Sequence, residues 1–125
     1  MNFAPYGMRS MNNRVNKYLF DMKVAIESIN EFVVGIDLEG YKTNKLIRSA
    51  VERQLEIIGE SVKRIERMGE PVPIANARHI VSFRNILVHE YERLEDETVW
   101  MIVKKDVPQL LEEINGLLGN VHPNG

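Results

Sequence analysis

Apolar residues recur every three or four positions along much of the chain, and this spacing constrains the fold more than any other feature. One face of an α-helix repeats with a period of 3.6 residues, whereas a strand alternates with a period of two. Two long stripes follow the helical period: Val15, Tyr18, Leu19, Met22, Ile26, Ile29 and Val33, and then Ile47, Val51, Leu55, Ile58, Val62 and Ile65. We therefore expect two long amphipathic helices.

Glycine and capping residues set the ends of these two helices. Gly35 ends the first helix, expected over residues 13–34, because glycine readily adopts the left-handed conformation found after a helix C-terminus. A polar link over residues 36–42 follows. Thr43 can then cap the second helix, expected over residues 44–68, through its side-chain oxygen.

The second half of the chain predicts further helices. The prolines within 70–73 disfavour helical backbone before them, so a third helix should begin near Ile74. Asp96 can cap a fourth helix, whose apolar side is formed by Val99, Ile102, Val103, Leu110, Ile114 and Leu117. Pro108 interrupts it, so either the helix kinks there or a new helix starts with Asp106 as its cap.

No segment shows the period of a strand, and no internal repeat is visible. The expected fold is all-α, an antiparallel bundle of four to five helices. At 125 residues, of which 44% are hydrophobic, the chain fits one domain with a single helical core. We place this domain at residues 12–119, after a flexible arm or expression scar at 1–11 and before a flexible tail at 120–125.

The composition favours a cytoplasmic protein. Cysteine is absent, which excludes disulfides and thiolate metal sites and permits a reducing compartment. No apolar run approaches the roughly 20 residues that a membrane span needs, and the N-terminus lacks the order of a signal peptide. His79, His89 and His122 do not form a ligand cluster, so we expect neither a metal nor a cofactor.

The segment Arg84–Tyr91 carries the densest chemistry of the chain. Arg84 supplies a permanent charge on a planar fork that matches phosphate oxygens, and His89 can take and give a proton near neutral pH. Asn85 and His89 are four residues apart and would share one face of a helix. Tyr91 adds a hydroxyl that can orient a substrate or be modified. Together these groups suit chemistry on a phosphate.

A structural interpretation of the same residues is also open. Arg84 would then bridge to a neighbouring carboxylate, and His89 would end a helix, where a cation is favourable. We interpret His79 as a structural residue because it is displaced from His89 on the helical wheel. Three charged residues of the second helix are assigned to salt bridges or to a subunit contact: Glu52, Arg53 and Glu60.

The order arginine, four residues, histidine, one residue, tyrosine in Arg84, His89 and Tyr91 resembles the motif of the HEPN superfamily (higher eukaryotes and prokaryotes nucleotide-binding domains). More narrowly, the chain resembles HepT-like toxins of bacterial and archaeal toxin–antitoxin pairs. The resemblance covers roughly residues 12–118. It rests on four stretches that follow the order of that family, which are residues 50–60, 84–91, 99–100 and 106–110.

This resemblance implies a HEPN-like bundle and a metal-independent endoribonuclease toxin that acts on RNA as a homodimer. The RNA 2′-hydroxyl would attack the adjacent phosphate and leave a 2′,3′-cyclic phosphate. Arg84 and His89 would be catalytic, with His89 as general base or acid and Arg84 stabilising charge on the phosphorane oxygens. Asn85 and Tyr91 would contact the substrate. Each motif has one imidazole, and a twofold axis would supply the second proton carrier.

Tyr91 is also the expected site of modification. The resemblance implies a small nucleotidyltransferase antitoxin that can transfer AMP to the motif tyrosine and so neutralise the toxin. A bulky anion at this position would fill the RNA cleft and repel the substrate. The chain has no nucleotidyltransferase motif of its own, so the modifying enzyme would be a separate protein.

The overall charge argues against a general nucleic-acid binder. The net charge is −2 and the isoelectric point is near 5.9, whereas nucleic-acid binding gains affinity by neutralising many phosphates. Any RNA contact must be local. Five acidic residues lie close after the motif histidine: Glu90, Glu92, Glu95, Asp96 and Glu97. They favour an alternative function, a non-catalytic helical dimer that binds a nucleotidyltransferase partner.

Overall fold

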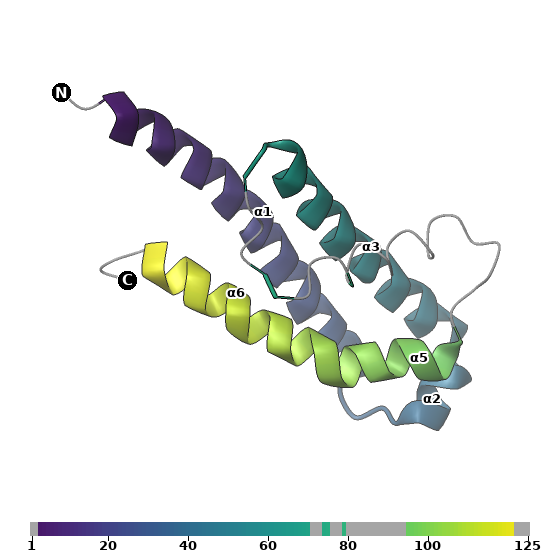
Figure 1. The fold of residues 1–125 in the computed structure, drawn as a ribbon. Coiled ribbons are helices and arrows are strands. Elements are labelled where there is room, and N and C mark those ends of the chain that lie inside the picture. The colour runs from purple at the N-terminus through teal and green to yellow at the C-terminus, as the bar shows by residue number, and fades with distance from the viewer. Residues whose placement is uncertain (1–2, 71–73, 76–78, 80–94, 122–125) are drawn as a thin grey trace.

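The computed structural model describes residues 3–70, 74–75, 79 and 95–121, and within these ranges the side chains from residue 13 to residue 119 (Figure 1). In this part of the chain every regular element is a helix, which confirms the predicted all-α class. The elements are α1 (Phe3–Val33), α2 (Leu38–Lys42), α3 (Lys45–Arg67), α5 (Asp96–Met101), the π-helical turn η1 (Ile102–Asp106) and α6 (Val107–Val121). None of the described helices is long and apolar enough to cross a membrane.

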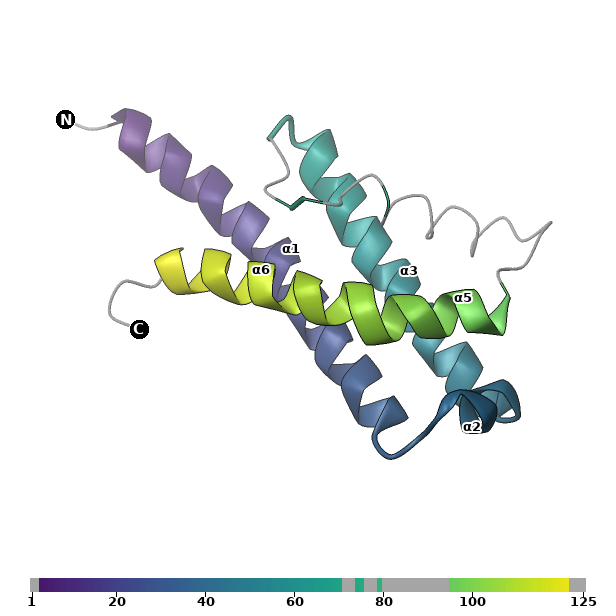
Figure 2. The same ribbon diagram turned by 60° about the horizontal axis from the view of Figure 1, so that its bottom comes forward.

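Helices α1 and α3 run antiparallel, and α5, η1 and α6 form one bent rod that packs against them (Figures 1 and 2). The apolar stripes predicted from the sequence face this interior. The buried residues include Leu19, Met22, Ala25, Ile26, Ile29 and Val33 of α1, Val51, Leu55, Ile58, Val62 and Ile65 of α3, and Val99, Ile102, Val103, Val107, Leu110 and Ile114 of the rod. The core therefore lies among three long helical segments, as in a HEPN-like bundle.

Helix α1 begins at Phe3, ten residues before the predicted start at residue 13. No residue in that interval ends a helix. Pro5 lies in the first turn, where its missing N–H would have no intrahelical acceptor in any case. The predicted end holds, because the chain leaves the helix after Val33 and Gly35 adopts a positive φ of 72°.

The predicted polar link contains the short helix α2. The Asp37 carboxylate caps it by accepting a hydrogen bond from the N–H of Gly40 at 2.8 Å. The prediction that Thr43 caps α3 is wrong. The Thr43 hydroxyl donates back to the carbonyl of Glu39 at 2.9 Å, and the side chain of Asn44 accepts the N–H of Ile47 at 3.0 Å instead. Thr43 and Asn44 are adjacent, and either could cap a helix. Thr43 forms the C-terminal cap of α2, so Asn44 caps α3.

The rod bends at η1, where the backbone stays helical. Neither Asp106 nor Asp96 acts as a cap: Asp106 is the last residue of η1, and Asp96 is the first residue of α5. Pro108 has no N–H to offer the carbonyl of Lys104, which removes one α-helical hydrogen bond. The backbone forms a wider turn here, in which the N–H of Val107 donates a hydrogen bond to the carbonyl of Ile102.

Candidate functional site

The four predicted site residues lie outside the described residues: Arg84, Asn85, His89 and Tyr91. The predicted third helix from Ile74 onward lies there too, apart from Ile74 itself and two other positions. What the structure describes is the frame on either side of the motif. On the N-terminal side these are Ile74, Ala75 and His79, and on the C-terminal side the chain resumes at Glu95.

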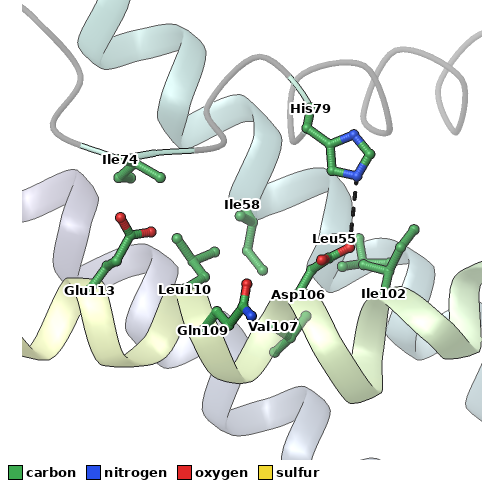
Figure 3. Close-up of a pocket in the computed structure, with 10 residues that line it drawn as sticks. All are labelled: Leu55, Ile58, Ile74, His79, Ile102, Asp106, Val107, Gln109, Leu110 and Glu113. Atoms are coloured by element: carbon green, nitrogen blue, oxygen red, sulfur yellow. Dashed lines mark ion pairs between the residues drawn. The ribbon is translucent and has the colours of Figure 1, made fainter.

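The N-terminal side of this frame contacts the rod at two points (Figure 3). The backbone N–H of Ala75 donates to the Glu113 carboxylate at 3.1 Å. The His79 Nε2 lies 3.7 Å from the Asp106 carboxylate. His79 therefore takes part in holding the chain on the rod, in agreement with its interpretation as a structural residue.

A small cavity lies between these two contacts. Its apolar lining includes Leu55 and Ile58 of α3 and Leu110 of α6, with Ile74 over it and only 6% exposed (Figure 3). Its water-accessible volume is about 30 Å³, which holds roughly two water molecules. A nucleotide cannot be enclosed in that volume. Among the described residues, this surface is therefore a packing seam.

The C-terminal side of the frame is a corner of ion pairs where α2 and α3 meet α5. Lys42 donates to the Glu97 carboxylate at 3.0 Å, and Arg48 Nε lies 3.8 Å from the carboxylate of Asp96. The hydrogen bond to Glu97 raises the pKa of Lys42, and the same bond lowers the pKa of Glu97. Two of the five acidic residues that follow His89 are thus paired with basic residues.

This pairing weakens the charge argument against RNA binding. Asp96 and Glu97 face Arg48 and Lys42, so their charge is partly neutralised within the fold. Glu95 is exposed at the start of α5. The negative potential that a polyanion meets near the motif is therefore smaller than the sequence alone suggests.

The family model described as "Ribonuclease HepT-like" matches residues 22–117, a range that includes all four predicted site residues. The chain belongs to the Ribonuclease HepT-like family. This assignment confirms the family and the enzyme class, ribonuclease, that the sequence predicted.

Several relatives share most of their length with the chain. "Putative RNase MJ1380" of Methanocaldococcus jannaschii is 38% identical over 101 residues, which are 80% of this chain and 93% of the relative. "Probable ribonuclease HepT" of Thermococcus cleftensis is 37% identical over 97 residues, 74% of this chain and 86% of the relative. "Putative RNase TTE0752" of Caldanaerobacter subterraneus is 29% identical over 102 residues, 81% and 91% of the two chains. No solved structure gives a significant match.

Sequence reasoning missed two residues of this HepT-like frame, Asp106 and Glu113. Both belong to the rod, yet each contacts a position far back in the chain, at His79 and Ala75. Pro108 was the signal for an irregular turn beside Asp106. No sequence feature indicated the partner of Glu113. The charged residues assigned to salt bridges on α3 include two that form them: Arg53 pairs with Glu56 at 3.5 Å, and Glu60 pairs with Arg64 at 3.3 Å.

Proposed function

We propose that this HepT-like chain is an endoribonuclease toxin that cleaves RNA by attack of the RNA's own 2′-hydroxyl, without a metal ion. The observation that carries the proposal is the presence of Arg84, His89 and Tyr91, in their motif spacing, within the range that the family model matches. The 2′-hydroxyl needs a base to remove its proton and the leaving oxygen needs an acid, roles that an imidazole fills near neutral pH.

The roles of the side chains follow from their chemistry. His89 transfers the proton as general base or acid, and Arg84 stabilises the charge that develops on the phosphorus-bound oxygens. Asn85 and Tyr91 contact the substrate. The chain supplies one motif imidazole, whereas concerted catalysis uses two proton carriers, so we propose a homodimer that brings two motifs into one cleft. Two Arg84 side chains in that cleft concentrate positive charge in a protein whose net charge is −2.

Regulation belongs to the same proposal. A nucleotidyltransferase antitoxin transfers AMP to the Tyr91 hydroxyl: the phenolic oxygen attacks the α-phosphorus of ATP and loses its proton, and pyrophosphate leaves. One phosphodiester charge is then added beside Arg84 and His89. The added group blocks the cleft by its bulk and its charge.

The test is cleavage of single-stranded RNA in the presence of EDTA by the purified chain. We expect Arg84→Ala and His89→Ala each to lower the rate by about 10² or more, with circular dichroism and melting temperature close to wild type. Lys17→Ala is the control, since this exposed lysine of α1 pairs with Asp21 and the variant should cleave like wild type. Cleavage that persists in both motif variants would refute the assigned roles. An intact, folded chain that only binds a nucleotidyltransferase would favour the non-catalytic alternative.

A further inference from the structure

The two contacts that hold the chain before the motif lie on one face of the rod. Asp106 contacts His79, and Glu113 contacts Ala75 (Figure 3). The two acidic residues are seven positions apart, about two helical turns, so their side chains lie on the same side of the rod. Leu110 lies between them on that side and is 5% exposed. Ala75 and His79 therefore both contact the side of the rod that these three residues form.

The π-helical turn fixes where Asp106 lies on this line. Five buried residues of the rod, besides Ile102, are spaced by four, four, three and four positions: Val99, Val103, Val107, Leu110 and Ile114. Those 15 positions make four turns, whereas four turns of α-helix hold about 14.4 residues. A wider turn at Ile102–Asp106 absorbs the excess and keeps both ends of the rod facing the core. It also leaves the Asp106 side chain at the edge of the core, 30% exposed and directed at His79.

We propose that Asp106 is a positioning residue for RNA cleavage: the π-helical turn presents its carboxylate to His79, and this contact sets the place of the motif that follows. This inference rests on the proposed function. Arg84 comes five residues after His79, and five residues span at most about 18 Å. A shift of the backbone at His79 is thus passed on to Arg84 over a short length of chain. Catalytic geometry tolerates little displacement, since a misplacement of about 1 Å can cost 10²-fold in rate.

The pair is unsuited to a purely stabilising role. The His79 side chain is 53% exposed, and exposed ion pairs contribute little to the free energy of unfolding. The buried part of the seam already holds Ile74 by apolar contact with the rod. Loss of the Asp106 carboxylate should therefore leave the fold in place and release the chain at His79.

The experiment compares Asp106→Asn, His79→Gln and the double variant in RNA cleavage and in hydrogen–deuterium exchange of the full-length protein. We expect each single variant to lower kcat by about tenfold to a hundredfold, with KM and melting temperature near wild type. The double variant should be no slower than the slower single variant, because each substitution removes the same contact between Asp106 and His79. Asp106→Glu should restore part of kcat. Peptides covering residues 80–94 should exchange faster in Asp106→Asn.

Asp21→Asn is the matched control, because Asp21 forms a comparable exposed pair with Lys17 on α1, at 3.0 Å. It should change neither kcat nor the exchange of residues 80–94. Additive losses in the double variant, unchanged kcat in Asp106→Asn, or a loss that follows the melting temperature would overturn the positioning role. If the wild type cleaves no RNA, the proposed function fails. Exchange at residues 80–94 then still decides whether Asp106 positions this segment.

Discussion

The Lys42 ammonium lies 3.0 Å from the Glu97 carboxylate and links α2 to the first turn of α5. The two residues are 55 positions apart in the chain. The pair joins α2 to the helix with which the described chain resumes after the motif. Its hydrogen bond lowers the pKa of Glu97 and raises the pKa of Lys42.

These shifts predict how the free energy of unfolding depends on pH. Glu97 has a lower pKa in the folded state, so its contribution is present above the ordinary value near 4.5 and is lost as the pH falls through the folded-state value. Lys42 has a raised pKa, so its contribution is present below 10.5 and is lost as the pH rises through the folded-state value. We expect Glu97→Gln to reduce the acid sensitivity of urea denaturation midpoints, by a small amount because both side chains are exposed. Glu112→Gln serves as the control, because Glu112 is an exposed glutamate of α6. Equal acid sensitivity in Glu97→Gln and wild type would contradict this account.

Two neighbouring valines at the C-terminal end of α1 test the assignment of the core: Val33 is the last residue of the helix and Val34 follows it. Val33 is 7% exposed and Val34 is 75% exposed. Val33→Ala removes two buried methyl groups, worth about 0.8 kcal/mol each, and leaves a cavity, so it should lower the free energy of unfolding by about 1–3 kcal/mol. Val34→Ala should change it by less than about 0.5 kcal/mol. Chemical denaturation measures both, and equal losses would show that this face of α1 is wrongly assigned.

The proposed homodimer predicts the mass of the protein in solution. Sedimentation equilibrium should give twice the chain mass of 14.4 kDa. Wild-type chains that are unfolded and refolded together with an excess of His89→Ala chains should then lose most of their cleavage, because each mixed dimer holds only one of the two imidazoles. A monomer that cleaves RNA at full rate would rule out the shared cleft.

Tyr91 should act as the switch between active and neutralised protein. Each AMP adds about one charge, which at a separation near 4 Å and an effective dielectric of 20 interacts by roughly 4 kcal/mol with a neighbouring charge. Co-expression with a cognate nucleotidyltransferase should add one or more AMP masses to the wild type and abolish toxicity. Tyr91→Phe should gain no mass, and it should stay toxic if the phenol hydroxyl is dispensable for cleavage. Modification that persists in Tyr91→Phe, or neutralisation without a mass change, would assign the switch elsewhere.

The sequence predicted the parts of this fold that depend on local periodicity. The stripes of α1, α3 and the rod are buried as expected, because a helical period needs only near neighbours to be recognised. Helix α2 was missed, since it is five residues long and its burial of Tyr41 depends on distant partners such as Trp100, whose ring centroid lies 5.2 Å away. Thr43 and Asn44 are both good caps, and only the presence of α2 decides between them.

The candidate site likewise has one part that the sequence predicts and one part that it does not. The motif of Arg84, His89 and Tyr91 can be recognised from the sequence, because its residue types and their spacing define its chemistry. The contacts that frame the motif cannot be predicted in this way, because Asp106 contacts His79 only when the rod is packed on α3. Pro108 indicates that the regular α-helix is interrupted. Whether the interruption is a kink, a new helix or a π-helical turn depends on which residues of the rod are buried in the core.

The chemical end of the cleaved RNA tests the central proposal most directly. Purified protein should be incubated in EDTA with an RNA of defined sequence, and the products identified by mass spectrometry. Attack by the 2′-hydroxyl predicts a 2′,3′-cyclic phosphate on one fragment and a 5′-hydroxyl on the other, with no cleavage when the nucleotide before the scissile phosphate is 2′-deoxy. A 5′-phosphate and a 3′-hydroxyl, or cleavage of the 2′-deoxy substrate at the same position, would contradict the proposal.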